Sequence, residues 1–429
     1  MNVTPTFSPA RASTALTTVV LCCGAALIEG IDLQSMGIAA PKLGPEFHLS
    51  SRQLGLVLTA SPIGLFFGAF IGGRIADFWG RKSALVLAIA VFGAFQLCTA
   101  WGAGFWSLLL IRFLCGLGLG GAYPNLIALT AEASATRYSL INVVITMAGM
   151  PAGGALASLI GFLAGADGDW RIIFYIGGIA PLILAPIMVF ALPESRAFRE
   201  AKAGAATGGA RPSVWSALFG NSRALPTCLL WVGIFFTTVV TWLLLNWLPV
   251  LMGARGFSKT DALIIQILFN VGAATGSILV GWCIQRTRSP LLLFGCYVAM
   301  AAGLFLLAHL DKNLILVCAA AALVGTFVLG AQFILYGLSP EYYSVESRGT
   351  GTGAAVAASR LGSATGPLLA GLLLGSGSSE VRVLEALLPV TAIAAAAAVG
   401  LLFIRRRPES GVSRESGERR GQVASPGAG

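Results

Sequence analysis

The stretch ALTTVVLCCGAALIEGIDLQSMGIAA, residues 15–40, decides what kind of protein this chain forms. It is an apolar run long enough to cross a bilayer as a helix, which takes roughly 20 residues, yet it contains Glu29 and Asp32. An acidic side chain at the centre of a bilayer costs roughly 2.5–3.5 kcal/mol. A spacing of three residues puts both carboxyls on one helix face. This pattern indicates a membrane protein that uses the acids for proton transfer or substrate binding.

The composition agrees with a membrane protein. The chain has 429 residues, of which 56% are hydrophobic and only 11% are charged, whereas soluble domains carry about 25% charged residues. The apolar runs are too long and too uniform for barrel strands. We therefore predict an all-α membrane protein with twelve transmembrane helices, at residues 15–40, 53–73, 83–101, 106–130, 140–164, 171–192, 225–250, 260–284, 290–309, 313–336, 349–375 and 383–404.

The longest connection between these runs divides them into two sets of six. We predict an N-terminal six-helix bundle at 1–192, a cytoplasmic linker at 193–224, a C-terminal six-helix bundle at 225–404 and a disordered cytoplasmic tail at 405–429. The two halves also repeat each other at an offset of 209 positions: Gly116, Gly121, Ala122 and Glu132 recur as Gly325, Gly330, Ala331 and Glu341. Parallel six-helix repeats are typical of transporters that bind substrate at the repeat interface.

The basic residues predict the orientation of these helices. With the N-terminus inside, nineteen Lys and Arg residues lie in cytoplasmic segments and seven on the opposite side, while Arg112 and Arg360 fall within helices. Positive charge marks the cytoplasmic side, so we expect both termini in the cytoplasm. The net charge of +10 thus mainly reflects the orientation of the helices in the membrane. Because the basic residues do not cluster in one domain, we expect no nucleic-acid partner.

No cofactor or metal is expected. All eight cysteines fall within apolar runs and none forms a CxxC pair, and His48 and His309 are far apart in the sequence. Small core residues are the ordinary interpretation of such cysteines. An enzyme would need clustered ligands or a nucleophile with its base, a receptor would suit a large extramembrane domain, and a built-in motor would need an ATP-binding loop. The sequence offers none of these, so we predict no enzymatic activity.

Three motifs resemble the major facilitator superfamily. Gly73 to Lys82, GRIADFWGRK, resembles the loop signature between its second and third helices, Arg112 to Gly121 its fourth-helix signature, and Leu192 to Ser195 the segment that closes its sixth helix. The resemblance implies the twelve-helix fold of that superfamily and a cytoplasmic gate. The simpler alternative is a basic loop that only sets topology. The gate residues that the resemblance implies are Gly73, Asp77, Gly80, Arg81, Lys82 and Glu132.

Within the superfamily the chain resembles the aromatic acid:proton symporters. The resemblance rests on Glu29 to Asp32, Arg348 to Gly351 and Ser359 to Ser363, and residues 29–40 and 120–130 look closest to the (hydroxyphenyl)propionate transporters of that group. It implies import of an aromatic carboxylate with protons across the inner membrane by alternating access. Many members have Asp at the first acidic position, where this chain has Glu29.

The charged residues inside the helices are the main candidates for the site. Glu29, Asp32 and Arg112 are predicted to couple protons, and Asp32 also to contact substrate; the alternative is that the arginines neutralise the acids for packing alone. Burial favours the neutral form of a carboxyl, and a nearby like charge makes the two acids titrate as a pair. Arg360 is predicted to anchor the substrate carboxylate, because arginine stays charged and its planar fork matches two oxygens.

Polar and aromatic residues on the fourth, seventh and tenth helices are further candidates for contact with an aromatic ring and its hydroxyl. Ordinary packing and helix–helix hydrogen bonds are the alternative for each of them. An exporter, or a porter of a non-aromatic small acid, is the second candidate function, although Gly149-Met150-Pro151 lacks the adjacent Gly-Pro typical of drug/proton antiporters. We expect the monomer to be functional. The ring-contact candidates are Tyr123, Asn125, Trp242, Asn246, Gln332 and Tyr336.

Overall fold

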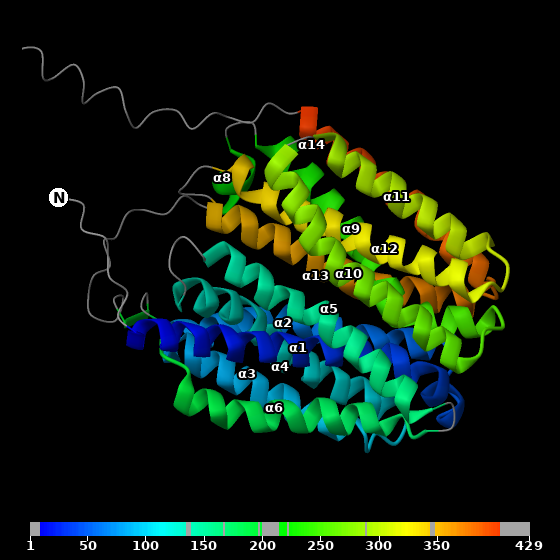
Figure 1. Cartoon of the computed structure of the whole chain (residues 1–429), viewed down its shortest axis with the longest axis horizontal. Coiled ribbons are helices and arrows are strands. Elements are labelled where there is room, and N and C mark those ends of the chain that lie inside the picture. The colour runs from blue at the N-terminus through cyan, green and yellow to red at the C-terminus, as the bar shows by residue number, and fades with distance from the viewer. Residues whose placement is uncertain are drawn as a thin grey trace, which may run out of the picture.

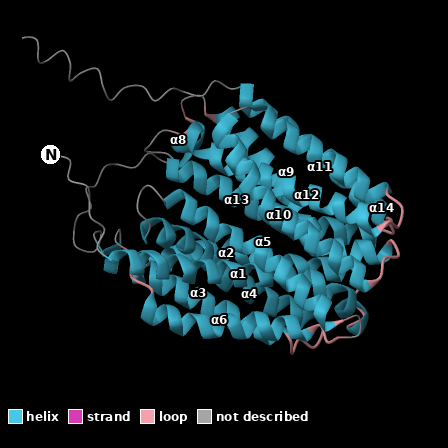
Figure 2. Ribbon diagram, in the orientation of Figure 1, coloured by secondary structure: helices cyan, strands magenta, loops and turns pink. Residues whose placement is uncertain are grey.

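The computed structural model describes residues 9–133, 139–165, 168–195, 198–199, 214–220, 223–287, 290–343 and 348–403. In that part of the chain every regular element is helical (Figure 2). Helices are expected because lipid offers no partner for backbone N–H and C=O groups, which a helix satisfies internally. The first six long helices are α1 (Pro9–Glu46), α2 (Ser51–Trp79), α3 (Arg81–Thr99), α4 (Phe105–Ala133), α5 (Ser139–Ala164) and α6 (Arg171–Ala191).

The second six long helices follow a stretch that contains the short helix α8 (Val214–Phe219). Eleven helices of the described chain are long and apolar enough to cross a membrane; α13 has the length, but its Gly, Ser and Thr residues lower its hydropathy. The twelve predicted helices are confirmed, with several extended by a few residues. The second six are α9 (Ala224–Ala254), α10 (Lys259–Thr287), α11 (Pro290–His309), α12 (Leu314–Leu338), which continues into the 3-10 turn η1 (Ser339–Tyr342), α13 (Arg348–Gly375) and α14 (Glu380–Phe403).

Local sequence signals set the boundaries of α2. Its N-terminus is a capping box, in which the Ser50 side chain accepts from the backbone of Gln53 and the Gln53 side chain accepts from the backbone of Ser50. It ends at Gly80, whose φ of 94° lies in a region that side chains with a Cβ rarely adopt. Gly80 thus separates α2 from α3 with a one-residue break, which brings the loop signature to the end of the bundle.

The helices form two stacked groups, α1–α6 and α9–α14 (Figure 1). The pairing of helices repeats in the two groups: α1 packs on α5 as α9 packs on α13, and α2 packs on α4 as α10 packs on α12. Two repeated glycines lie at matching contacts, Gly116 against the backbone of Ser61 and Gly325 against that of Phe269. This arrangement confirms the two predicted six-helix repeats.

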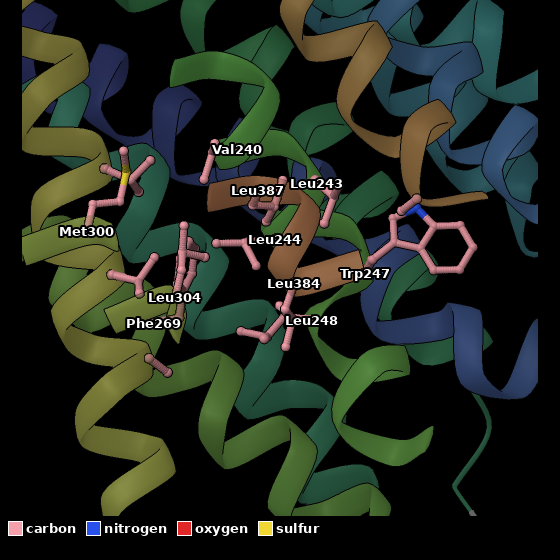
Figure 3. Close-up of a cluster of buried hydrophobic side chains, with 14 of the residues drawn as sticks. Val240, Leu243, Leu244, Trp247, Leu248, Phe269, Met300, Leu304, Leu384 and Leu387 are labelled. Atoms are coloured by element: carbon pink, nitrogen blue, oxygen red, sulfur yellow. The ribbon is translucent and has the colours of Figure 1, made fainter. Parts of the chain in front are cut away.

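The largest apolar cluster has most of its members in the second group (Figure 3) and extends into the first, where it includes Met36, Leu58 and Phe174. Its fully buried members include Leu244 and Trp247 of α9, Phe269 of α10, Met300 of α11 and Leu387 of α14. Trp247 also donates its indole N–H to the carbonyl of Pro367 on α13, at 3.0 Å. Because lipid is as apolar as these side chains, close packing and such interhelical hydrogen bonds hold the bundle together. The group thus forms a rigid frame behind the residues that face the first group.

The two groups meet most closely at one end. We call it the His48 end, after the loop between α1 and α2, and the opposite end the Gly80 end. A Cβ on Gly371 of α13 would lie 2.7 Å from the Cα of Gly55 on α2. Gly73 and Gly353 lie about five turns from these residues on the same helix faces, and a Cβ on either would meet nothing within 4 Å. The helices α2 and α13 therefore touch at the His48 end and separate toward the Gly80 end.

Candidate functional site

The predicted acid pair lies at the centre of α1, and its two members have different partners. Asp32 is fully buried, and its Oδ1 is 2.8 Å from Nη1 of Arg112 on α4 in an ion pair. Glu29 is 2% exposed, and neither of its carboxylate oxygens has a hydrogen-bond partner. Residue Gly30 lies between them against the backbone of Met150 on α5, which fixes the rotation of α1. The structure therefore distinguishes two carboxyls that the sequence presents as equivalent.

The Asp32–Arg112 pair has neighbours that sequence reasoning missed. Nη1 of Arg112 also donates to Oε1 of Gln96 on α3, at 2.7 Å, and Gln96 donates to the hydroxyl of Ser35 at 3.3 Å. The Cys115 thiol lies 3.7 Å from Oδ1 of Asp32. The position of a neutral amide or thiol within an apolar run does not indicate a functional role. Only the packing of α1, α3 and α4 identifies these residues as neighbours of the ion pair. Together they hold the guanidinium of Arg112 in one orientation.

The second predicted arginine joins the two helix groups. Arg360 of α13 is half-buried, and its guanidinium carbon lies 5.2 Å from the ring centroid of Tyr123 on α4. That distance is within the range of a cation–π interaction. The Nε of Arg360 has no hydrogen-bond partner, and its charge acts on Glu29. Glu29, Tyr123 and Arg360 thus form a cluster between the groups, with a cation, an aromatic ring and an unpaired acid.

Polar side chains of the second group continue from this cluster. The hydroxyl of Tyr336 on α12 lies 3.5 Å from Nε2 of Gln332, the donor of that hydrogen bond. Gln332 also donates to Thr238 of α9 at 3.3 Å, and its Oε1 accepts from Thr241 at 3.3 Å. Tyr123 and Tyr336 are half-buried, so part of each ring stays accessible. This combination offers a carboxylate receptor and hydrogen-bonding groups beside aromatic faces.

The remaining ring-contact candidates are engaged elsewhere. The amide of Asn125 donates to the carbonyl of Gly121 at 2.8 Å, and that of Asn246 to the carbonyl of Trp242 at 2.9 Å, each within its own helix. Trp242 is 8% exposed and packs in an apolar cluster with Leu33 of α1. These contacts match the alternative of ordinary packing, and a role of these residues toward substrate stays a prediction.

The predicted gate residues lie at the Gly80 end of the first group. Arg81 forms an ion pair with Glu132 at the end of α4, and Glu132 accepts from the hydroxyl of Ser195 at 2.7 Å. The backbone N–H of Lys82 donates to Glu194 at 3.0 Å, so the segment that closes α6 joins the same cluster. Sequence reasoning quoted Glu194 and Ser195 but assigned them no role in the gate.

Some predicted features lie outside the described residues. They include the side chain of Asp77, most of the linker and the tail beyond residue 403. Within the stretch 193–224 the structure describes α8, whose Leu218 is buried and accepts at its carbonyl from Thr227 at 2.9 Å. The predicted domain boundaries stay predictions.

The fold and these residues are those of a membrane transporter built from two six-helix repeats. The Major Facilitator Superfamily profile matches residues 22–339 and 267–427, and the chain belongs to this superfamily. It is thus a multi-pass membrane transporter rather than an enzyme.

Comparison with known proteins shows which members of the superfamily this chain resembles. The 3-(3-hydroxy-phenyl)propionate transporter of Escherichia coli (strain K12) is 40% identical over 405 residues, covering 94% of this chain and 97% of that protein. The 4-hydroxybenzoate transporter of Pseudomonas putida is 32% identical, covering 88% of this chain and 90% of that protein. Among solved structures, a D-xylose-proton symporter matches with a TM-score of 0.73 and 18% identity, covering 92% of this chain and 98% of that one. The hydroxyphenylpropionate and hydroxybenzoate transporters confirm the predicted resemblance to transporters of aromatic acids, and the symporter structure confirms the fold.

Proposed function

We propose that this protein imports an aromatic carboxylate together with protons by alternating access. The observation that carries the proposal is Arg360, a half-buried cation between the two helix groups that lies over the ring of Tyr123. A guanidinium in this position matches a carboxylate bidentately, and the neighbouring rings suit an aromatic body. The relatives named above, which transport hydroxyphenylpropionate and hydroxybenzoate, support the same substrate class.

Each part of such a substrate has a candidate partner. The carboxylate would bind Arg360, the ring would lie against Tyr123 and Tyr336, and a ring hydroxyl would meet the amide of Gln332. Asp32 is paired with Arg112, so its contact with substrate would be indirect. The proposed class is a hydroxyphenylpropionate or a benzoate-type acid.

Protons provide the driving force in this proposal. Glu29, Asp32 and Arg112 are the candidates for proton coupling, because they are charged groups buried within the first helix group. A carboxyl that can lose and regain its charge lets the transporter couple the entry of an anion to the entry of a proton. The alternative, an exporter or a porter of a non-aromatic acid on the same fold, uses the same residues and differs in direction or in the ring contacts.

The orientation in the membrane follows from the positive-inside rule. We place the protein in the inner membrane with both termini and the Gly80 end on the cytoplasmic side. We take the monomer as the functional unit. The contact of Gly55 with Gly371 then closes the outer side, and the described structure corresponds to the state open toward the cytoplasm. The residues Gly73, Asp77, Arg81 and Glu132 would contribute to closing the inner side in the opposite state.

Reconstituted protein tests this function directly. Proteoliposomes with an alkaline interior should accumulate hydroxyphenylpropionates or hydroxybenzoates, and collapse of the pH gradient with a protonophore should abolish the accumulation. Aliphatic acids of equal charge serve as controls for the ring, and amides of the aromatic acids as controls for the carboxylate. Accumulation of aliphatic acids alone would favour the alternative substrate class. Accumulation only under the reversed gradient would favour export.

A further inference from the structure

We propose that Glu29 alone carries the coupled proton, and that its carboxylate and the substrate carboxylate alternate as the counter-ion of Arg360. The proposal rests on the proposed function and assigns separate roles to two acids that the sequence treats alike. It makes the Asp32–Arg112 ion pair a fixed element that stays intact during transport. It also fixes the stoichiometry at one proton for each singly charged acid.

Asp32 is held in a buried ion pair. Its Oδ1 accepts from Arg112 at 2.8 Å, and both side chains are at most 3% exposed. Protonation of Asp32 would leave the guanidinium of Arg112 buried without a counter-ion, and arginine cannot discharge itself. Gln96 holds the same Nη1 at 2.7 Å, but a neutral amide does not compensate the charge. Asp32 is therefore poorly suited to exchange a proton while the pair stays intact.

The environment of Glu29 suits a carboxyl group that alternates between an ionised and a neutral form. Neither carboxylate oxygen has a hydrogen-bond partner, and an ionised group buried in this way is stable only if a charge compensates it. Arg360, whose guanidinium lies over the ring of Tyr123 on the neighbouring helix α4, is the cation that acts on it. When Arg360 has no other anion, ionised Glu29 compensates it. When another anion occupies Arg360, the neutral form of Glu29 becomes the favoured one.

The surroundings of Glu29 contain few other groups that could take this role. The helix α1 packs on α2, α4, α5, α6 and α9. Helices α5 and α9 carry no charged side chain, and the charged residues of α2 and α6 lie near the helix ends. The titratable or charged groups near Glu29 are Asp32 on its own helix, Arg112, Cys115 and Tyr123 on α4, Tyr336 on α12 and Arg360 on α13.

The transport step that follows is balanced in charge. Substrate enters as R–COO⁻ and binds Arg360, and Glu29–COO⁻ takes one H⁺ from the same side of the membrane to become Glu29–COOH. The net charge of the cluster is unchanged, so the loaded and empty transporter carry the same charge through the conformational change. On the other side the acid leaves, Glu29 releases its proton and again compensates Arg360. Substrate and proton thus bind with positive coupling, which is reciprocal by linkage.

Proton uptake on binding tests the assignment. Purified protein in weakly buffered detergent solution, with a pH indicator, is titrated with a singly charged hydroxyphenylpropionate at alkaline pH, where Glu29 of the empty protein is ionised. Wild type should take up one proton for each acid bound, and its affinity should fall about tenfold for each pH unit on the alkaline side. Glu29→Gln should bind the acid with no proton uptake and with an affinity independent of pH. Glu46→Gln, an acid-to-amide change at the end of the same helix, should behave as wild type.

Two results would overturn the assignment. One is stoichiometric proton uptake by Glu29→Gln, which would move the carrier to another group, Asp32 first. The other is uptake of no proton, or of two, by wild type. If wild type bound none of the aromatic acids, the proposed function itself would fail, and this assignment with it.

A measurement on wild type alone keeps the proposal testable if Glu29→Gln does not fold. Import of a singly charged acid with one proton moves no net charge. An inside-negative potential, set by potassium and valinomycin in proteoliposomes, should therefore leave the initial rate of gradient-driven uptake unchanged. A severalfold acceleration by the potential would indicate more than one proton for each acid and would overturn the proposal.

Discussion

Asp32 and Glu29 lie one turn apart on α1, and their surroundings stabilise a buried carboxylate in different ways. Around Asp32 the first helix group provides an arginine, an amide and tight packing, and both partners of the ion pair belong to that group. Around Glu29 no side chain bonds the carboxylate, and the charge that acts on it comes from Arg360 across the interface. A complete pair stabilises one arrangement, whereas an acid that shares its cation with a ligand can respond to the ligand. The difference separates a structural role from a coupling role.

The largest expected difference is in stability. Asp32→Asn should lower the free energy of unfolding by about 3–5 kcal/mol, because it leaves Arg112 buried without a counter-ion. Glu29→Gln, the matched change one turn away, should have a smaller effect, because no side chain bonds this carboxylate and the Arg360 that it compensates is only half-buried. Denaturant unfolding of both variants in detergent measures this.

A double variant serves as the control for stability. Asp32→Asn combined with Arg112→Met removes both charges and should recover most of the stability that the single variant loses. Equal destabilisation by Asp32→Asn and Glu29→Gln would remove the distinction between the two regions.

The next effect concerns recognition by Arg360. Arg360→Lys keeps the charge but loses the planar fork, so binding of an aromatic acid should weaken by roughly 1.5–3 kcal/mol, and Arg360→Ala should weaken it more. Competition by the acid and by its amide, measured in wild type and variants, reports on the carboxylate. Equal competition by acid and amide in wild type, or wild-type affinity in Arg360→Ala, would mean that the carboxylate is bound elsewhere, with Arg112 as the next candidate.

A matched pair of glycines tests which end of the molecule is closed. Gly371→Ala would place a Cβ 2.7 Å from the Cα of Gly55, and such overpacking costs typically 1–3 kcal/mol. Gly353→Ala lies on the same face of α13 where nothing is within 4 Å, so it should leave this state unchanged. Hydrogen exchange of residues 51–58 should accelerate in Gly371→Ala alone. Faster exchange in Gly353→Ala only would reverse the assignment of the closed end.

The smallest effect is expected at the gate. Asp77→Asn and Glu132→Gln should each slow transport severalfold while the substrate affinity stays within a few-fold of wild type. A partly exposed ion pair such as Arg81–Glu132 contributes up to about 1 kcal/mol, and it shifts the balance of states without touching ligand. Initial rates and binding constants of the same preparations separate the two quantities. An unchanged rate with greatly weakened binding would contradict the gate role.

The sequence predicted the helices well because lipid leaves the backbone few alternatives. Apolar runs near the bilayer length gave all twelve long helices, although α1 extends to Glu46 through Pro41 and Pro45. The short helix α8 was not predicted, since six residues show no clear period. The end at which α2 and α13 touch was also not predictable, because Gly55 and Gly73 look equivalent in the sequence and only packing separates them.

The candidate site was predictable in its charges but not in its pairing. Glu29, Asp32, Arg112 and Arg360 stand out because charge is costly in lipid. Which acid meets which arginine depends on the depth and rotation of α1 against α4 and α13, and spacing along one helix contains no such information. Gln96 was missed for a related reason, since a neutral amide in an apolar run becomes meaningful only beside Arg112.

Uptake and exchange by Glu29→Gln in proteoliposomes test the central claim most directly. The account predicts that this variant does not accumulate an aromatic acid under a pH gradient, yet exchanges labelled for unlabelled acid at a rate comparable to wild type, because Arg360 still binds the carboxylate and no proton has to move. Wild-type accumulation under the gradient by Glu29→Gln would contradict the account.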